Sequence, residues 1–430
     1  MSSAPRLHRW HDRPLVGVGL LMAAAGFAQF SPSAALGDVA EQFGDLGEGD
    51  TIAEQAGLPG SVLGGGLAII RLSGLLALPL AALADRVGRR PTSLTFAAVG
   101  LVMTIAAAGS PSYWWFVAAF AVARPFLTAT DTVGAVLAAE LTGLRDRAKA
   151  IAMTSAAYGV GAGSIAALRG LAGEGLGFRG LFAVAAIPLV AVPVAGRLLT
   201  EPDRFTHRAR VAAAGRPAVV PVLGAVPPLY RPHLAVLAAI AFATGLITGP
   251  VATLLFVYAE NVLDVSSAVT AGLVVAAGLT GLVGLVLGRL LADRLGRRPT
   301  AALAMVLMAG AGVLTYSGSV PALAVGYLCG VLFGAAYGTP AIALTAELFP
   351  TSIRSAVAGW LVVAGVLGST AGLWLAGTIA DALDSFGEAM AVVCLPAGLV
   401  AVLFARLPET RGLELERSAP EEPHRRVEPA

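Results

Sequence analysis

The sequence predicts an all-α membrane protein with 12 transmembrane helices, arranged as two six-helix bundles. Three observations support this fold class. Hydrophobic residues make up 57% of the 430 residues and charged residues only 13%, whereas a soluble globular protein carries about 25% charge. Apolar stretches long enough to cross a bilayer recur along the whole chain. The second half of the chain also repeats landmarks of the first half 208 residues later.

The predicted spans follow from length, because a helix needs about 20 apolar residues to cross a hydrocarbon core of about 30 Å. In the first half these stretches lie at residues 14–34, 60–83, 92–110, 114–138, 149–168 and 180–198. In the second half they lie at residues 233–257, 267–290, 300–318, 322–345, 355–378 and 387–405. The polar, proline-rich segment between the two sets is typical of a linker. We expect an N-terminal bundle at 1–199, a cytoplasmic linker at 200–232, a C-terminal bundle at 233–406 and a cytoplasmic tail at 407–430.

The distribution of charge predicts the orientation of the chain in the membrane. With both termini inside, all but four of the 29 basic residues fall on the cytoplasmic side, the exceptions being Arg71, Arg124, Arg169 and Arg179. The loop between the first two spans instead collects acidic residues: Asp38, Glu41, Asp45, Glu48, Asp50 and Glu54. Cytoplasmic loops carry an excess of Lys and Arg. We therefore predict a multi-pass protein of the cytoplasmic (inner) membrane with both termini in the cytoplasm.

An internal repeat divides the chain into two related halves. Residues 85–92 read DRVGRRPT, and residues 293–300 read DRLGRRPT, 208 positions later. Further landmarks keep this register to within one residue: Glu140 with Glu347, Arg147 with Arg354, and Glu201 with Glu409. A repeat of this length indicates two bundles related by a pseudo-two-fold axis.

Two such bundles joined by a basic loop resemble the major facilitator superfamily, and the resemblance covers the whole chain. Its most specific element is the Asp-Arg-x-Gly-Arg-Arg loop between the second and third helices of each half. The stretches AELFPTSIR at 346–354 and PETRG at 408–412 look like the sugar-porter branch and metabolite:proton symporters. The resemblance implies alternating access, in which two bundles rock about a binding site near the bilayer midplane.

The repeated loops are predicted to form a cytoplasmic gate. Their arginines are suited to bind the carboxylates of Glu140 and Glu347, and their aspartates can meet a helix N-terminus or an arginine. Glycines in the loops permit a tight turn. The alternative is that the arginines only set the topology. The predicted gate consists of Asp85, Arg86, Gly88, Arg89, Arg90, Glu140 and Arg147, with Asp293, Arg294, Gly296, Arg297, Arg298, Glu347 and Arg354.

Three charged residues lie within predicted spans and have no charged counterpart in the second half: Arg71, Arg124 and Asp131. A charge at membrane depth is costly and marks a functional site by default. Asp131 lies about 13 Å along the helix from Glu140, which places it near the midplane. It shares one helical stripe with Arg124 and Thr128.

A carboxyl group at this depth can take up and release a proton, because burial favours its neutral form and a nearby arginine its charged form. We predict that Asp131 is the proton-coupling carboxylate and that Arg124 or Arg71 is its partner. Two alternatives stay open, namely a static ion pair that holds helices together and an arginine that binds an anion.

Other polar or aromatic residues are weaker candidates for the substrate cavity: Gln29, Thr128, Thr244, Thr248, Tyr337, Thr339 and Trp374. Most of them lie in helices that line the cavity of the resembled fold. The glycines of two spans are expected to allow close helix packing: Gly159, Gly161 and Gly163 in the fifth span, with Gly365, Gly368 and Gly372 in the eleventh.

The sequence does not indicate an enzyme. It contains no metal-ligand spacing and no nucleotide-binding loop, so we expect no metal and no cofactor, with the proton gradient as the energy source. The net charge of +2 is too small to suggest a nucleic-acid partner.

The leading interpretation is a monomeric secondary transporter in the lipid bilayer that moves a small organic solute, sugar-like or another metabolite, by proton-coupled alternating access. The alternatives are an efflux antiporter for drugs or metabolites and a sensor of solutes that does not transport them. A sensor normally adds a signalling tail, and few residues follow Gly412.

Overall fold

The computed structural model describes residues 8–44, 51–172, 175–201, 224, 226–350 and 352–411 of the chain, apart from five side chains within helices: Ile52, Asp85, Leu144, Arg145 and Ala148. The first half contains α1 (Arg13–Ala34), α2 (Leu36–Phe43), α3 (Ile52–Ala56), α4 (Gly60–Ser73), η1 (Gly74–Leu76), α5 (Ala77–Val87), α6 (Arg89–Ala106), η2 (Ala107–Gly109), α7 (Tyr113–Leu141), α8 (Leu144–Ala172), α9 (Gly177–Ala183) and α10 (Ala186–Leu198). The second half contains η4 (Pro228–Tyr230), α12 (Arg231–Thr253), α13 (Leu255–Val257), η5 (Tyr258–Val262), α14 (Ser267–Arg294), α15 (Arg297–Thr315), α16 (Val320–Leu348), α17 (Arg354–Leu383), α18 (Phe386–Leu399) and η6 (Val400–Arg406).

Twelve helical stretches among the described residues are long and apolar enough to cross a membrane. Each coincides with one predicted span, and the ends differ by only a few residues. The predicted all-helical membrane fold is therefore confirmed. The seventh span ends earlier than predicted, because α12 stops at Thr253 and the chain continues through the short helix α13 into the π-helical turn η5.

Helix starts in the two halves are fixed by residues of the same kind. Ser112 caps α7 by accepting a hydrogen bond from the Trp115 N–H at 3.3 Å, and Ser319 caps α16 through the Ala322 N–H at 3.4 Å. Such caps satisfy backbone donors that have no partner within the helix. The repeat in sequence is therefore also a repeat in local structure.

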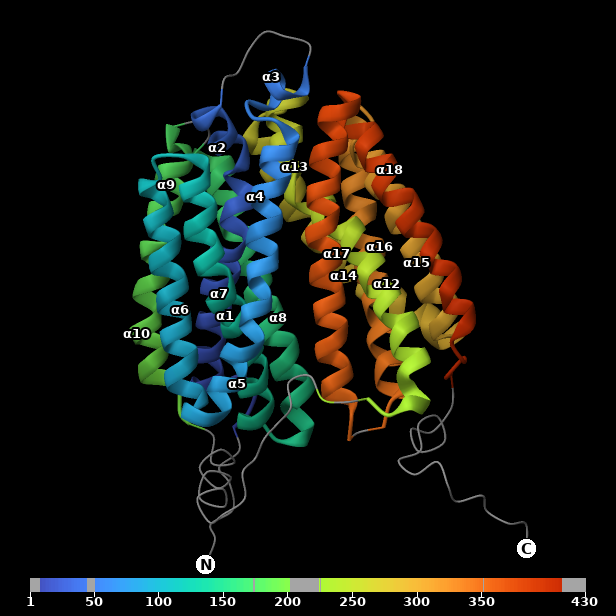
Figure 1. Ribbon diagram of the computed structural model, residues 1–430. Helices are drawn as coiled ribbons and strands as arrows, with labels where there is room; N and C mark the ends of the chain where they lie inside the picture. The colour runs from blue at the N-terminus through green and yellow to red at the C-terminus, as the bar shows by residue number, and fades with distance from the viewer. Residues whose placement is uncertain are drawn as a thin grey trace, which may run out of the picture. The chain divides into compact units, whose positions relative to one another are not determined.

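The second span is interrupted near its middle. Helices α4 and α5 follow one another along this span (Figure 1). They are separated by the 3-10 turn η1, which begins at Gly74. Pro79 lacks an N–H, and its ring would clash with the carbonyl four residues earlier in a continuous α-helix. The tighter turn at η1 therefore forms immediately after the segment that carries Arg71.

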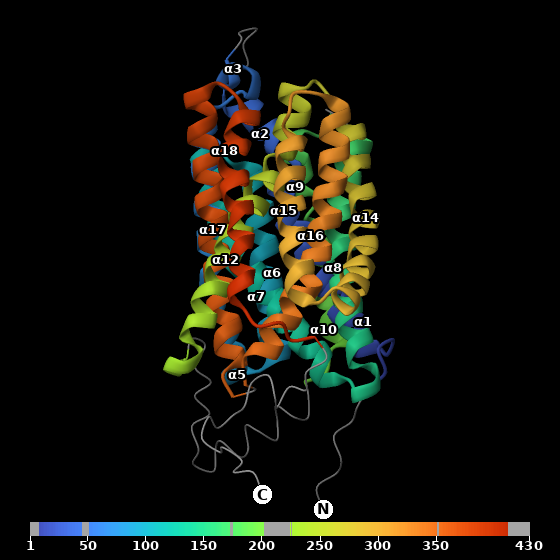
Figure 2. The same cartoon turned by 90° about the vertical axis from the view of Figure 1, so that its right-hand side faces the viewer.

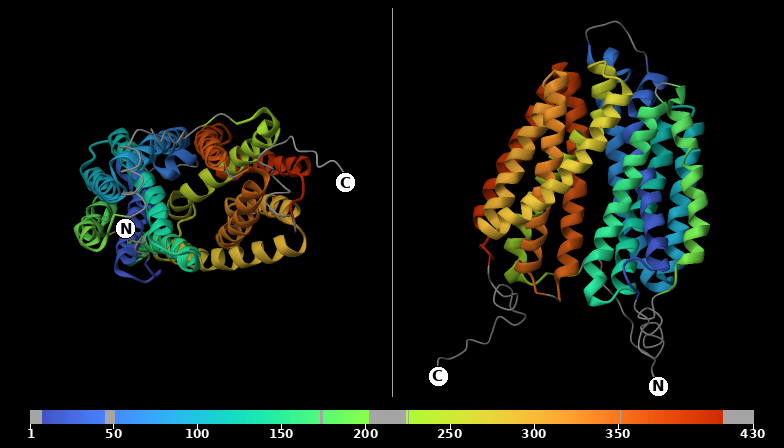
Figure 3. Two further views of the ribbon diagram at one scale, coloured as in Figure 1. Left: turned by 90° about the horizontal axis from the view of Figure 1, so that it is seen from below. Right: turned by 180° about the vertical axis from the view of Figure 1, so that it is seen from behind.

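The chain folds into two compact units. The first comprises Met1–Val220, Ala252–Val275 and Gly377–Asp384, and it contains the helices of the first half. Within it α1 is central and packs against α6, α7, α8 and α10. The view from behind in Figure 3 shows α1, in dark blue, between α8 and α10. The first unit also contains the end of α12, all of α13 and η5, the start of α14 and the last residues of α17, which come from the second half of the sequence.

Two glycines allow α1 and α8 to approach closely. A Cβ on Gly26 would overlap the backbone carbonyl of Tyr158, and one on Gly161 would overlap the carbonyl of Ala23. By contrast, a Cβ on Gly159 or Gly163 would meet nothing within 4 Å. The expected close packing is thus correct for Gly161 and wrong for Gly159 and Gly163, because those two point away from the α1 seam.

The second unit comprises Pro221–Val251, Ala276–Ala376 and Ser385–Ala430. Within it α15 and α16 run side by side (Figure 2), and α18 and η6 pack on α15. Its core contains the fully buried Tyr316, whose hydroxyl donates to the Val251 carbonyl at 3.0 Å.

The acidic loop between the first two spans carries two helices that the sequence analysis did not predict. Helix α2 buries Leu36, Val39 and Ala40. Helix α3 begins with a capping box in which Thr51 and Glu54 each bond the other's backbone. Helices α2 and α3 both pack on elements of the first unit, at the face predicted to be outside.

Candidate functional site

The charged residues predicted within spans come together in the first unit. Arg71 lies on the last turn of α4, and Arg124 and Asp131 lie on α7. Arg124 interacts electrostatically with Asp131, and Arg71 interacts with Arg124. The side chain of Tyr158 on α8 interacts with all three. Each of the four residues is partly exposed although it lies inside a helical unit rich in apolar residues.

Direct contacts hold the two arginines in place. Arg71 Nη2 donates to Thr253 Oγ1 at 3.2 Å, and Thr253 is 4% exposed at the end of α12. The stem of Arg124 runs over Gly74, where a Cβ would be 3.7 Å from Arg124 Cγ. Among the described residues, no carboxylate oxygen lies within 4.0 Å of the guanidinium group of Arg71 or Arg124. Arg124 and Asp131 thus influence each other without forming a direct ion pair.

Sequence reasoning missed Tyr158 and Thr253 as members of this cluster. Neither is charged, and neither belongs to a repeated motif. Tyr158 could have been singled out as the polar ring beside a glycine-rich stretch of α8, but only tertiary packing brings α8 and the end of α12 to the two arginines.

The predicted cavity residues fall into two groups. In α1 and α7, Gln29 Nε2 and Thr128 Oγ1 are buried and have no hydrogen-bond partner among the described residues. In the second unit, the Thr244 hydroxyl lies 3.1 Å from Tyr337 Oη, and Thr248 donates to the Thr244 carbonyl at 3.0 Å. Thr339 is partly buried in α16. Trp374 on α17 is 54% exposed.

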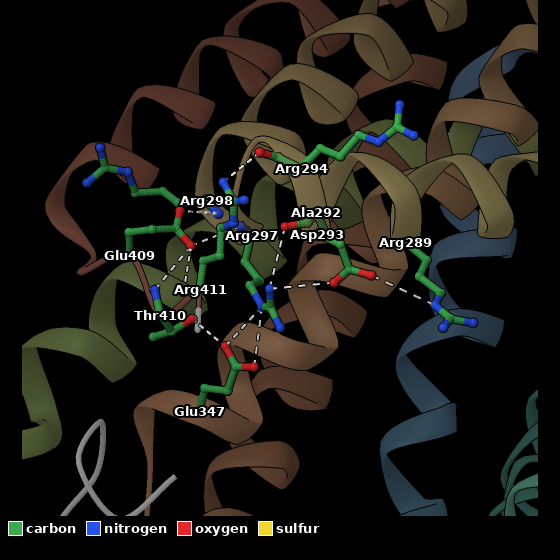
Figure 4. Close-up of polar contacts among 10 residues, drawn as sticks. All are labelled: Arg289, Ala292, Asp293, Arg294, Arg297, Arg298, Glu347, Glu409, Thr410 and Arg411. Atoms are coloured by element: carbon green, nitrogen blue, oxygen red, sulfur yellow. Dashed lines mark hydrogen bonds and ion pairs between the residues drawn. The ribbon is translucent and has the colours of Figure 1, made fainter. Parts of the chain in front are cut away.

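In the second unit the Asp-Arg-x-Gly-Arg-Arg loop, residues 293–298, forms a compact ionic cluster around Arg297 (Figure 4). Arg297 Nε lies 3.3 Å from Glu347, and Arg297 Nη1 lies 3.7 Å from Asp293. Glu347 also accepts a hydrogen bond from the Thr410 hydroxyl. The side chain of Arg294 points away from the cluster, and only its carbonyl takes part, by accepting from Arg411 at 2.6 Å.

The first unit repeats this arrangement. Arg89 forms an ion pair with Glu140, and both side chains are largely buried. Arg90 donates to the Gly196 carbonyl, Arg86 is exposed, and the side chain of Asp85 lies outside the described part. In both units, therefore, these contacts join residues of the same half of the sequence.

The remaining gate candidates occupy equivalent positions. Gly88 and Gly296 have φ of +124° and +113°, which side chains with a Cβ rarely adopt. Arg354 Nη2 donates to the Phe349 carbonyl at 3.2 Å. In the described segments, the Nε atoms of Arg147 and Arg354 are both buried without a hydrogen-bond partner. Whether these residues gate transport stays a prediction.

The repeated glutamates Glu201 and Glu409 cap helices that are distant in sequence. Glu201 accepts from the Arg89 and Arg90 N–H groups at 2.8 and 2.9 Å, at the start of α6. Glu409 accepts from the Arg297 and Arg298 N–H groups at 3.0 and 3.1 Å, at the start of α15. A carboxylate at this end also interacts favourably with the helix dipole. The sequence analysis used both residues only as landmarks of the repeat.

We predict that Glu409→Gln and Glu201→Gln each lower the stability of the protein by about 1 kcal/mol, because the neutral amide keeps only one acceptor oxygen for the two N–H groups. Thermal unfolding in detergent measures this effect. Unchanged melting temperatures for both variants would contradict the capping role.

A second ionic cluster lies in the first unit at the predicted outer face. Arg169, at the end of α8, is 4% exposed. Its guanidinium binds Asp38 with two nitrogens at 2.5 Å each and Glu260 at 2.7 Å. Asp38 lies on α2, and Glu260 lies in the π-helical turn η5. One cation therefore joins the outer segment of the first half to a segment that follows the seventh span.

A second contact at the predicted outer face joins α17 to α4. Asp381 accepts hydrogen bonds from the Gly60 and Ser61 N–H groups at 2.6 and 2.9 Å and thereby caps α4. Gly377 lies so close that a Cβ there would overlap the Gly60 carbonyl. Sequence reasoning missed Arg169 and Asp381. A basic residue on a predicted face otherwise rich in acids was the available signal for Arg169.

A known protein family and several solved structures are similar to this chain. The family model of the Major Facilitator Superfamily matches residues 16–291 and 267–429. No curated protein sequence matches the chain. Among solved structures, the inward-open xylose transporter XylE from E. coli superposes with a TM-score of 0.70 at 16% identity, covering 94% of this chain and 98% of that one.

Two other solved transporters are similar to nearly the same extent. The nucleoside transporter NupG gives a TM-score of 0.68 at 10% identity and covers 91% of this chain and 98% of its own. A bacterial homologue of the human lysosomal transporter Spinster gives 0.68 at 14% identity, with 92% and 96% covered. At such identities the likeness shows the fold alone, and the assignment as a transporter and not an enzyme rests on the family model. Because the family model spans nearly the whole sequence, the chain belongs to the major facilitator superfamily.

Proposed function

We propose that the protein is a secondary active transporter that moves a small organic solute across the cytoplasmic membrane by alternating access, coupled to a proton through Asp131. The observation that carries the proposal is the cluster of Arg71, Arg124 and Asp131 inside a unit built of membrane-spanning helices. Ionisable groups at such depth are costly and are retained for transport or proton relay.

The outer contacts support alternating access. The ion pair between Arg169 and Glu260 and the cap formed by Asp381 on α4 link segments from the two halves of the sequence. Both contacts lie within the first unit, and we propose that they break when the outer side opens to the solute. Cycles of breaking and re-forming such contacts are the expected behaviour of a gate in this fold.

The proposed solute is sugar-like or another small metabolite, since solved transporters for xylose and for nucleosides share the fold. The protein is proposed to act as a monomer in the inner membrane, with both termini in the cytoplasm, on the basis of its charge asymmetry. The alternative is efflux by antiport. The direction of solute movement in a proton gradient distinguishes antiport from symport.

We predict that Asp131→Asn abolishes accumulation driven by a proton gradient while solute exchange at equal concentrations continues. A gradient of one pH unit supports about tenfold accumulation at one proton per solute, and the variant is expected to reach no accumulation. Uptake into proteoliposomes of a solute identified by thermal shift measures this effect. If an inward proton gradient drives the solute out of wild-type vesicles, the protein is an antiporter.

The matched control is Asp146→Asn, which removes a carboxylate near the start of α8 that pairs with Lys149 at 3.8 Å. It should leave accumulation unchanged. Full gradient-driven accumulation by Asp131→Asn would show that this carboxyl group does not carry the coupled proton.

A further inference from the structure

The cluster at the centre of the first unit carries an excess of positive charge. Arg71 and Arg124 contribute two cations, and Asp131 contributes one carboxylate. The two guanidinium groups carry like charges, and Arg71 lies within the electrostatic influence of Arg124, so they repel each other. Tyr158 lies near all three groups, and a tyrosine hydroxyl is neutral at ordinary pH.

The residues around the two arginines do not neutralise this excess. Arg71 donates to the uncharged hydroxyl of Thr253. Arg124 packs its stem on Gly74, and within the described ranges neither arginine has a carboxylate at ion-pair distance. Two guanidinium groups that are partly withdrawn from bulk water are unfavourable unless charges and hydrogen bonds compensate them.

Further hydrogen-bonding groups lie at the same level of the bundle. Thr128 Oγ1, one turn from Arg124 on α7, is buried without a partner among the described residues, and so is the Gln29 Nε2 donor on α1. Met22 fills the space beside Gly134, which fixes the register of α1 against α7. Because the two helices run in opposite directions, Gln29 lies level with Leu127 and Thr128.

We infer that the transported solute carries an anionic group, most simply a single carboxylate, and that Arg71 and Arg124 bind it with the Thr128 hydroxyl and the Gln29 amide. Guanidinium groups bind carboxylates through two parallel hydrogen bonds. This inference rests on the proposed transport function and names its substrate class.

The same charges explain how a proton is coupled to an anion. Protonation of Asp131 removes the one negative charge that repels the incoming carboxylate. At a separation on the order of 10 Å and an effective dielectric constant near 20, this repulsion changes affinity on the order of tenfold. By linkage, the bound anion favours protonation of Asp131 to the same extent. One anion and one proton together leave the charge of the site unchanged, so their symport is electroneutral.

The test uses the purified full-length protein and matched pairs of probes. Sodium lactate and sodium gluconate are compared with lactamide and glucose at equal ionic strength, and inorganic phosphate is a further anion. Thermal shift at pH 6 and pH 8 gives apparent affinities for wild type, Arg71→Gln, Arg124→Gln, Asp131→Asn and the control Arg179→Gln. Arg179 lies at the predicted outer face, where it contacts the Ala108 carbonyl.

We expect a carboxylate to stabilise the wild type, more strongly at pH 6, whereas its neutral counterpart does not. Each of Arg71→Gln and Arg124→Gln should weaken this binding at least about tenfold, and Arg179→Gln should not. Asp131→Asn should bind the carboxylate equally at both pH values. If either glutamine variant fails to fold, Arg71→Lys and Arg124→Lys are used instead. They keep the positive charge but lack the planar guanidinium group, and they should weaken binding by a smaller factor.

Stabilisation by phosphate alone would assign the site to phosphate esters and overturn the carboxylate. A neutral probe that binds equally to wild type and both arginine variants would overturn the anionic site, and so would the absence of a shift with every anion. Gradient-driven uptake of such a neutral solute would leave the transport function intact. Conversely, an anion that binds through the two arginines but is not transported would refute the proposed transport function, and the proposed anion-binding site would stand.

Discussion

Replacing Arg169 by methionine is expected to destabilise the protein by about 3–5 kcal/mol, the range measured when one partner of a buried ion pair is removed. Arg169 is the shared partner of Asp38 and Glu260, and all three side chains are at most 12% exposed. Methionine keeps much of the volume of the arginine stem, so the loss reports the charge. Thermal unfolding of the purified protein measures it.

The pH dependence of this loss of stability provides a second measurement. Without the guanidinium group, the buried carboxylates of Asp38 and Glu260 have lost their shared cation. Their burial then costs less free energy when they are protonated. The deficit of Arg169→Met should therefore be small near pH 5 and grow as pH rises towards 8.

A triple variant separates charge from packing. Adding Asp38→Asn and Glu260→Gln to Arg169→Met removes every charge of the cluster, and neutral replacements of a buried ion pair are often tolerated. We expect the triple variant to recover most of the lost stability. A triple variant as unstable as Arg169→Met would indicate that the arginine acts by filling space.

The sequence predicted the spans well because length and hydrophobicity decide them. A helix in lipid must satisfy all its backbone groups internally, so an apolar run of about 20 residues leaves little choice of structure. The break at η1 was harder to foresee, because Pro79 leaves the second span apolar and changes only its hydrogen bonding.

The site was predictable only where it carries a charge. Arg71, Arg124 and Asp131 stand out in an apolar sequence because such groups are rare at membrane depth. Their neighbours Tyr158 and Thr253 are ordinary residues of spans, and their importance arises from the packing of α8 and α12 against α4 and α7. Likewise, the repeat identified Glu201 and Glu409, but only the structure shows the N–H groups that they cap.

The glycines of α8 show most clearly what the sequence leaves open. Gly159, Gly161 and Gly163 differ little in the sequence, yet only Gly161 faces the Ala23 carbonyl of α1. We expect Gly161→Val to prevent the close approach of α1 and α8. Overpacking of a well-packed core typically costs about 1–3 kcal/mol, and here the added carbons would meet backbone, which cannot turn aside as a side chain can.

Gly159→Ala and Gly163→Ala are the matched controls, since an added Cβ at either position meets nothing within 4 Å. Each is expected to stabilise the protein by up to about 1 kcal/mol, because alanine is a better helix former than glycine. Melting temperatures of the three variants, with size-exclusion profiles to monitor folding, should place Gly161→Val below wild type and the two alanine variants at or above it. Because α1 packs against α6, α7, α8 and α10, a displaced α1 would also shift Gln29 relative to α7, and the loss at Gly161 should therefore reach solute binding as well as stability. Equal effects at all three glycines would mean that the α1–α8 seam does not depend on Gly161.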